Sequence, residues 1–421
     1  MVATAATVVT MLGGCRKERQ PSMVPTRTND AEIGTNPRHL PAYLPGDDPK
    51  IGIADLKPRR WKIVDVHEHV QGERDAERLL GAMDRLGIDR TCLMGSTEYT
   101  LTLNAAYGFE GFKENNEAIL AIKKKHPDRF CAFVTLNPLD DNNLRLLQDY
   151  VARGADGLKL YLGHGGSTGK GPFHSMRLDD ARMEAVFAWA EAVQLPIVLH
   201  VNLEKFWDET VNLLEKHPYL RVDLPHFGLE KGDSRRLMRL GFLLNRYPYV
   251  YTDVSAGYYT FQTEAFEMLA MNRPLVRAFC EAYGEKIMYG ADMVVEPHKD
   301  DAYIVNTARS YMQFLESDRW RFFLQPTRIM LGLGLDDQTL RKVYELAPRA
   351  FLLADENGRL PDRTRGWPSP GVREPARPRI PPEGVSAAGR PDVLSRTPSP
   401  TSSTFEARPG STSTPDARIT R

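Results

Sequence analysis

One short segment of this 421-residue chain has residue types and spacing that suit metal chemistry. It reads Asp65-Val-His67-Glu-His69 and closes an apolar run that begins at Trp61. Residues two apart in an extended strand point to the same side, so His67 and His69 are expected to project together, with the glutamate between them pointing away. Neutral imidazole is the commonest protein ligand for zinc and related metals. The pair predicts a metal site, although two histidines at a strand end can also be purely structural.

Further polar residues stand where later strand-like runs end. They are Lys159, His200, His226, Asp253 and Asp292. In a barrel of alternating strands and helices, the C-terminal ends of the strands meet at one face, where active sites lie. Nitrogen and oxygen ligands from separate strands suit a catalytic metal with one position open for water. Asp253 is the ambiguous member, because it fits an ion pair in the barrel wall as well as a place in the pocket.

Strand and helix signals alternate regularly through residues 51–357. This alternation predicts a parallel α/β fold, and eight units over this length fit a closed (β/α)8 TIM barrel. An open doubly wound sheet is the alternative, but it usually has a glycine-rich phosphate loop after its first strand, where this chain has His67 and His69. The expected strands are 62–68, 90–95, 130–136, 157–162, 196–201, 221–226, 249–254 and 286–291, and the expected helices are 75–86, 116–125, 143–151, 181–193, 205–216, 235–246, 264–283, 302–315 and 338–353.

Taken together, these motifs resemble the amidohydrolase superfamily, in its branch of metal-dependent hydrolases related to aminocarboxymuconate-semialdehyde decarboxylase. The resemblance covers roughly residues 61–353. It implies that His67, His69 and His200 bind a divalent metal, with zinc as the expected ion. It also implies that Asp292 sits at the metal and accepts a proton from metal-bound water, while His226 polarises the substrate or shuttles a proton. The residues that carry the resemblance are Asp65-x-His67-x-His69, Lys159, His200, His226-x-Gly228 and Gly290-x-Asp292.

Lys159 has two interpretations. The segment Gly157-Leu-Lys159-Leu-Tyr161 resembles dihydroorotase-like members, in which a carboxylated lysine bridges two metals. In that case His200 and His226 would hold the second metal. In the other interpretation Lys159 is a plain ammonium that binds a substrate carboxylate or pairs with a nearby acid. The family branch favours the one-metal form.

Loops after the strands supply candidate substrate contacts. The loop 163–174 holds five glycines, so it is able to move at the active-site face, with His164, Lys170 or His174 touching substrate. A loop without substrate contacts is the alternative. Tyr258, after the seventh strand, and His298, after the eighth, are further candidates.

Three functions follow from these observations. The first is hydrolysis of a carboxylic ester, lactone or amide bond by metal-bound hydroxide. The second is non-oxidative decarboxylation of an aromatic or unsaturated acid on the same scaffold. The third is a non-catalytic surface lipoprotein that keeps the barrel for binding.

Composition and the two ends of the chain give expectations about partners, localisation and disorder. Lys plus Arg (55) equals Asp plus Glu (55), which gives no electrostatic case for nucleic acid as a partner. Leu12-Gly-Gly-Cys15 resembles a bacterial lipobox, so residues 1–15 are interpreted as a lipoprotein signal, with membrane attachment through lipidated Cys15 in the cell envelope. The alternative is a cytoplasmic protein. Residues 16–50 are expected to form a disordered tether and 358–421 a disordered Pro/Ser/Arg-rich tail. The expected partner is a small-molecule substrate, and a homodimer is left open.

Overall fold

The computed structural model describes residues 56–58, 60–102, 108–162, 176–229, 234–257, 259–325 and 327–364. The signal and tether expected over residues 1–50, the loop positions His164, Lys170 and His174, and Tyr258 lie outside the described residues. The chain is packed as far as Thr364, because Arg363 is buried and donates to the backbone carbonyls of Val193 and Gln194. Residues 358–364, which were expected to belong to the disordered tail, are thus among the described residues and include a buried side chain.

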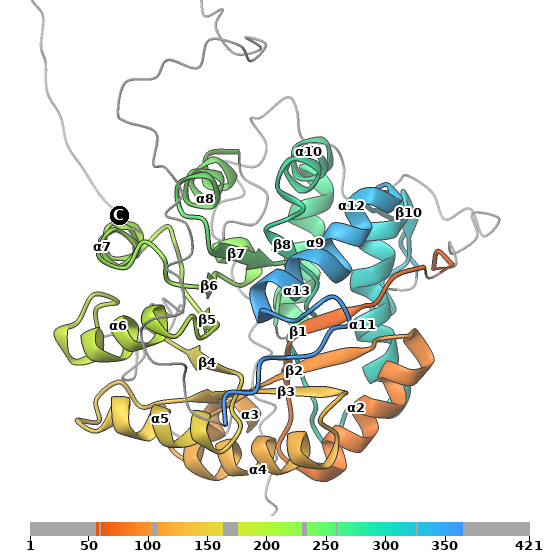
Figure 1. Cartoon of the computed structure of the whole chain (residues 1–421). Coiled ribbons are helices and arrows are strands. Elements are labelled where there is room, and N and C mark those ends of the chain that lie inside the picture. Colours follow the sequence, from red (N-terminus) through yellow and green to blue (C-terminus); the bar gives the residue numbers. More distant parts are fainter. Residues whose placement is uncertain are drawn as a thin grey trace, which may run out of the picture. The chain divides into compact units, whose positions relative to one another are not determined.

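Strands alternate with helices along the chain, as Figure 1 shows, and all hydrogen-bonded neighbours in the main sheet are parallel. The order β8-β7-β6-β5-β4-β3-β2-β1-β9 follows the sequence step by step. This confirms the predicted (β/α)8 barrel and excludes the doubly wound sheet, whose order would reverse at a switch point. The strands are β1 (Val64–His69), β2 (Arg90–Met94), β3 (Phe130–Thr135), β4 (Gly157–Leu160), β5 (Ile197–Leu199), β6 (Val222–Asp223), β7 (Val250–Asp253), β8 (Ile287–Met288) and β9 (Met293–Val294).

The barrel closes through an eighth strand that is interrupted in its middle. Its first part, β8, pairs with β7, and its second part, β9, pairs with β1. Backbone hydrogen bonds across the interruption run from Val66 N–H to the carbonyl of Tyr289 (3.0 Å) and from Asp292 N–H to the carbonyl of His67 (2.7 Å). The first and last strands are therefore joined along the segment that carries Asp292.

Helices surround the strands and bury one apolar stripe each. In α2 the apolar side chains of Leu79, Met83 and Leu86 recur at helical spacing and are buried, and the helix ends at Gly87 in the left-handed conformation. The helices are α2 (Glu73–Leu86), α3 (Glu98–Thr102), α4 (Phe112–Lys125), α5 (Asn143–Ala152), α6 (Glu184–Ala192) after a 3₁₀ turn at Ala181–Met183, α7 (Trp207–Lys216), α8 (Ser234–Arg246), α9 (Tyr259–Met271), α10 (Arg273–Tyr283), α11 (Asp301–Glu316), α12 (Asp337–Arg341) and α13 (Ala347–Leu352).

Two predicted helices differ from the observed ones. The single helix expected over 264–283 is two helices, because Pro274 stands at the start of α10 and lacks the N–H that a continuous helix needs. The helix expected over 338–353 contains a π-helical segment, Lys342–Leu346, between α12 and α13. An antiparallel pair, β10 (Arg319–Trp320) with β11 (Met330–Leu331), was not predicted.

The core has two main parts and two small clusters. The larger part lies between the outer faces of the strands and the helices. The smaller part fills the N-terminal half of the barrel and is covered by α13, where Phe351 stacks on Phe133 and contacts Tyr251 (ring centroids 6.2 and 5.4 Å apart). Cys92 and Cys131 face each other across β2 and β3 in this region, and both are free thiols.

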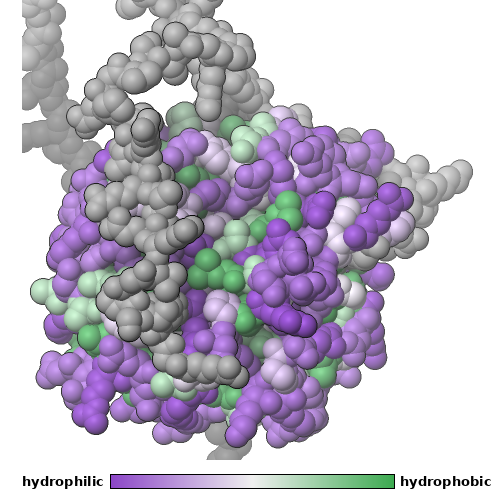
Figure 2. All heavy atoms as spheres, in the orientation of Figure 1, coloured by the Kyte–Doolittle hydropathy of each residue, from purple (hydrophilic) through white to green (hydrophobic). Residues whose placement is uncertain are grey.

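The outer surface drawn in Figure 2 is mainly hydrophilic, with smaller apolar areas between. Met238 (65% exposed) and Phe242 (49% exposed), one turn apart on α8, are among the exposed large apolar side chains. Among the described residues, no helix has both the length and the apolar composition that a bilayer crossing requires.

Candidate metal centre

Three side chains, two from the first strand of the barrel and one from the last, converge at the C-terminal end of the barrel. His67 and His69 come from β1, and Asp292 comes from the interruption between β8 and β9. Oδ1 of Asp292 lies 3.3 Å from Nε2 of His67 and 3.0 Å from Nε2 of His69. One ligand atom from each of the three lies within 4.8 Å of the others, and all three side chains are buried.

His226 extends this cluster from the turn after β6. Its Nε2 lies 3.5 Å from Oδ2 of Asp292, and its ring stacks on that of His67 with centroids 5.3 Å apart. A second group of mutually close ligand atoms consists of His67, His226 and Asp253. His67, His69, His226 and Asp292 are called the metal centre below.

His200 stands at the edge of the metal centre. Its ring contacts the ring of His226 with centroids 4.9 Å apart, and its side chain is only partly buried. Neither group of mutually close ligand atoms among the described residues includes it. The structure thus brings His200 next to His226, and its role as a metal ligand stays a prediction.

The chemistry of the donor set fits a divalent cation. Burial lowers the pKa of His69 and of His226 to about 4, so both imidazoles are neutral at pH 7 and have a nitrogen lone pair to offer. Burial opposes ionisation of Asp292, but the neighbouring histidines outweigh it and hold the pKa of this carboxyl well below its usual range. Neutral imidazoles with one ionised carboxylate are the ligands that zinc takes in catalytic sites.

Lys159 lies inside the barrel beside the metal centre. Its side chain is buried, and Nζ is 2.8 Å from Nε2 of His67. Burial lowers the pKa of Lys159 to about 8, so the amine is mostly protonated at pH 7. The lysine therefore places a positive charge next to His67, the histidine that belongs to both groups of mutually close ligand atoms.

Acids that point elsewhere surround the centre. Glu68 faces away from the histidines and accepts a hydrogen bond from the backbone N–H of Met293 (2.8 Å), as expected from its place between them. Burial raises the pKa of Asp65 to about 7 and that of Glu68 well above its usual value. Asp223 on β6 is fully buried next to Asp253, and burial raises its pKa well above its usual value.

Two site residues have the left-handed backbone conformation that side chains rarely adopt. The φ angles are 46° at Asp292 and 61° at His226. Such positions cost about 1–3 kcal/mol each and cluster at functional sites. The surroundings leave little room: a Cβ on Gly257, itself at φ 72°, would meet Oδ2 of Asp292 at 2.9 Å.

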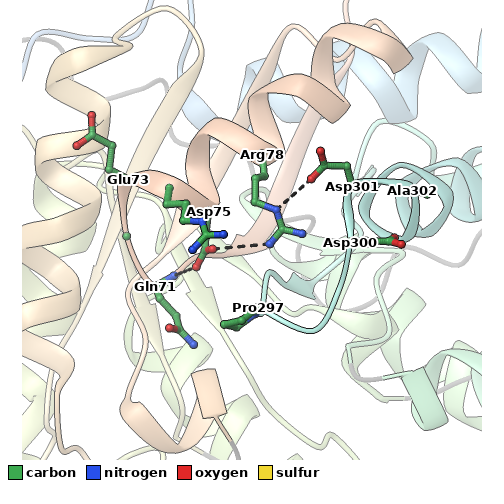
Figure 3. A pocket seen from close by; sticks show the side chains of 10 residues that line it. Gln71, Glu73, Asp75, Arg78, Pro297, Asp300, Asp301 and Ala302 are labelled. Carbon is green, nitrogen blue, oxygen red and sulfur yellow. Dashed lines mark hydrogen bonds and ion pairs between the residues drawn. The ribbon is translucent and has the colours of Figure 1, made fainter.

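Figure 3 shows a pocket of about 780 Å³ that is lined by residues just beyond the paired ends of β1 and β9. It lies between the first turns of α2 and α11, and Gln71 and Pro297 line it just after the paired ends of β1 and β9. Arg78 bridges its walls by pairing with Asp75 and Asp301. None of the four metal-centre residues lines this pocket, so it is a neighbouring depression and not the site of the chemistry.

His298 lies on the loop that follows β9. Its side chain is 68% exposed, and Nε2 is 3.5 Å from Oε2 of Glu296. This contact does not connect His298 to the residues of the metal centre. Its assignment as a substrate contact stays a prediction.

Two hydroxyl groups at the centre were not identified from the sequence. Ser96 Oγ lies 2.7 Å from Nδ1 of His69, and Ser255 Oγ lies 2.8 Å from Nδ1 of His226. A signal existed for Ser255, because it follows Asp253 by two residues at a strand end. Serine is too common at such positions for that signal to be specific.

Comparison with known proteins assigns the family. The family model described as Amidohydrolase matches residues 64–353, which is more than half of the chain. No curated protein matches the chain. Solved structures of similar fold include a probable 2-pyrone-4,6-dicarboxylic acid hydrolase from Acinetobacter baumannii (13% identity, 69% of this chain and 98% of that chain, TM-score 0.47).

Two further structures of similar fold are decarboxylases by title. They are 2,6-dihydroxybenzoate decarboxylase from Rhizobium (16% identity, 70% of this chain and 99% of that chain, TM-score 0.40) and 5-carboxyvanillate decarboxylase from Novosphingobium aromaticivorans, crystallised with manganese (15% identity, 71% and 99%, TM-score 0.43). The assignment rests on the family model, which spans the barrel from β1 through α13. The chain belongs to the amidohydrolase family of enzymes.

Proposed function

We propose that the chain is a divalent-metal-dependent enzyme that acts on a small molecule carrying a carboxylate or a carboxylic-acid derivative. The observation that carries this proposal is the convergence of His67, His69 and Asp292, whose ligand atoms lie within 4.8 Å of one another. Zinc is the first metal to test, because nitrogen-rich sites with one carboxylate suit it, and manganese is the second. A divalent cation supplies Lewis acidity to a substrate oxygen and lowers the pKa of a bound water.

The chain's own residues divide the remaining tasks. Asp292 has a second carboxylate oxygen, Oδ2, that faces His226 at 3.5 Å and is available to take up a proton. His226 is neutral and offers its Nε2 to the reacting molecule or to a proton in transit. Lys159 provides a fixed positive charge for an anionic group. Burial of the whole set strengthens each of these interactions by excluding water.

Decarboxylation and hydrolysis both fit this centre. Lys159 favours decarboxylation, because every substrate of a decarboxylase is itself a carboxylate, whereas an ester, lactone or amide need carry no charge. Hydrolysis is supported by the acceptor oxygen on Asp292, which a reaction with water requires. Family membership is compatible with either reaction, so the two are separated by experiment.

The test uses the full chain loaded with zinc or manganese. Aromatic and unsaturated acids, lactones and esters are supplied in parallel, and both carbon dioxide and newly formed acid are measured. Carbon dioxide release supports decarboxylation, and acid formation without it supports hydrolysis. A His69→Ala variant is the control for contaminating activity. Tight metal binding without turnover on any of these substrates would point to a binding protein, and failure to bind either metal would overturn the proposal.

The number of metal ions bound per chain shows whether Lys159 is carboxylated. The proposal expects one metal per chain, independent of bicarbonate. A value near two that depends on bicarbonate would mean that Lys159 is carboxylated and bridges two ions. Elemental analysis of the purified protein gives this number directly.

Attachment to the cell envelope through Cys15 and formation of a homodimer are separate proposals. The first rests on the lipobox-like segment and predicts a lipidated N-terminal cysteine in the mature protein. Mass spectrometry of the mature N-terminus tests it. Sedimentation of the purified protein tests the second.

A further inference from the structure

Asp253 is the most heavily hydrogen-bonded carboxylate beside the metal centre. Its Oδ2 lies 2.8 Å from Nδ1 of His67. Its Oδ1 accepts from the backbone N–H groups of His226 and Ser255, both at 3.0 Å, and from the hydroxyl of Ser255 at 2.5 Å. Four donors thus fix one buried side chain, which is fully buried on β7.

The partners of His67 determine which of its ring nitrogens carries a proton. An ionised carboxylate only accepts, so Nδ1 of His67 must donate to Asp253. A neutral imidazole that donates from Nδ1 accepts at Nε2, which lies 2.8 Å from Nζ of Lys159. His67 is therefore protonated on Nδ1 and has its lone pair on Nε2, the atom that faces Asp292.

The same carboxylate acts on His226 through a serine. The single proton of the Ser255 hydroxyl goes to Oδ1 of Asp253. Ser255 Oγ can then only accept from Nδ1 of His226, which lies 2.8 Å away. His226 is therefore also protonated on Nδ1, and its Nε2 faces Asp292.

We propose that Asp253 is a positioning residue that sets the tautomers of two histidines at once, His67 directly and His226 through Ser255, so that both Nε2 lone pairs point into the metal centre. This inference rests on the proposed function for its purpose, but the tautomers themselves are properties of the metal-free chain. His69 follows a separate route: Ser96 donates to the carbonyl of Met94 at 2.8 Å and so accepts from Nδ1 of His69. Ser96 therefore provides an independent comparison.

The Asp253→Asn variant tests the direct arm. The two backbone N–H groups still require an acceptor on the Oδ1 side, so the amide nitrogen takes the position of Oδ2 and faces Nδ1 of His67. Two donors then oppose each other, so the hydrogen bond that holds the proton on Nδ1 of His67 is lost. Metal affinity is expected to fall about 10–100-fold, as for other partners that orient metal-binding histidines. The tautomer is observed by nitrogen-15 NMR of the full chain labelled at histidine.

The Ser255→Ala variant tests the indirect arm. It removes the acceptor of His226 and leaves the hydrogen bond between Asp253 and His67. The spectrum of His226 should change more than that of His67, because Nδ1 of His67 lies 3.4 Å from this hydroxyl but keeps its 2.8 Å hydrogen bond to Asp253. Ser255→Thr should restore the wild-type spectrum of His226. Ser96→Ala is the matched control, since it deletes a hydroxyl beside His69 alone.

The outcomes distinguish this inference from the proposed function. Wild-type metal-free protein with Nδ1 protonated on both His67 and His226 supports the inference, and a proton on Nε2 of either ring overturns it without any variant. Unchanged spectra of both rings in Asp253→Asn would also overturn it. If the spectra follow the prediction but the wild type binds neither zinc nor manganese, the proposed function fails and the positioning role stands.

Discussion

The two ends of the barrel interior are built from the same strands but differ in kind. β7 contributes Tyr251 to the N-terminal end and Asp253, two residues farther along, to the C-terminal end. β5 contributes Val198 to the N-terminal end, and His200, one residue past the end of this strand, lies at the C-terminal end. Side chains two apart on a strand share a face, so one strand supplies both an apolar layer and a polar one. The position of a residue along the strand thus decides whether it packs in the apolar core or lies beside the metal centre.

The energetic consequences of the two ends are opposite. Phe133, Tyr251 and Phe351 bury aromatic surface at the N-terminal end, which stabilises the fold. At the C-terminal end, burial of Asp253, Asp292 and Lys159 costs free energy that their hydrogen bonds and ion pairs with neighbouring side chains and backbone groups offset. Variants at the first end should therefore change stability, and variants at the second should change metal binding.

The largest effect on metal binding is expected from His69→Ala, which removes a candidate ligand atom 3.0 Å from Oδ1 of Asp292. Residues that merely orient a ligand cost up to about 100-fold in metal affinity, so loss of the ligand itself should cost at least about that much. Chelator competition on the purified protein measures the affinity. Wild-type affinity in this variant would remove His69 from the ligand set.

Phe351→Ala addresses the opposite end. The ring is fully buried against Phe133 and Tyr251, so its removal should lower the free energy of unfolding by about 3–5 kcal/mol. Metal affinity of the folded variant should stay at the wild-type value. Phe351→Leu, which keeps most of the volume, should cost less. Urea unfolding and chelator competition on the same samples check both statements, and a loss of metal affinity in Phe351→Ala would show that the two ends are coupled.

A smaller effect at the metal centre is expected from Gly257→Ala. The backbone there is left-handed (φ 72°), and the added Cβ would lie 2.9 Å from Oδ2 of Asp292. Gly87→Ala is the matched control, because its φ is 67° and nothing lies within 4 Å of the added Cβ. Both variants should lose about 1–2 kcal/mol of stability from the backbone, and only Gly257→Ala should weaken metal binding. Equal metal affinities would mean that Asp292 can move aside.

The smallest effect concerns histidine charge. Burial opposes the charge of His217, which precedes β6, but Glu191 and Glu184 outweigh it and raise the pKa of this imidazole above its ordinary value. Its contribution to stability is therefore complete below about pH 6.5, the unfolded pKa, and is lost as pH rises through the folded pKa.

The His217→Gln variant makes this charge visible. It should be less stable than wild type at pH 6, by about 1 kcal/mol or less for a partly solvated ion pair, and the difference should shrink by pH 9. Unfolding titrations at both pH values test this. A difference that grows with pH would contradict the assigned direction of the shift.

The sequence predicted the architecture because long amphipathic helices and apolar strands repeat at a regular interval. It also indicated His67, His69 and Asp292 as partners, because strand ends in a barrel meet at one face. It did not indicate the partners of the ring nitrogens, Ser96 and Ser255. Those contacts depend on side-chain orientation across neighbouring strands, which no spacing within one segment determines.

Other features escaped prediction for separate physical reasons. β10 and β11 have two residues each, too few to show a period. The break before α10 was marked by Pro274, but the apolar periodicity continues across it. Arg363 lies in a proline- and arginine-rich segment, and its burial against Val193 and Gln194 depends on tertiary contacts that composition does not reveal.

If Asp292 binds a metal ion, the interrupted eighth strand couples metal binding to the closure of the barrel. Asp292 lies in the seam where the last strand meets the first, with its own N–H bonded to the carbonyl of His67. A cation bound by both residues would hold the first and last strands together from inside the barrel. Any opening of the seam then requires release of the ion, so the whole barrel gains about 2.7 kcal/mol of resistance to unfolding when free ion is present at a hundredfold excess over its dissociation constant. Amide protons along β1 should accordingly exchange more slowly in the loaded protein than in the metal-free one.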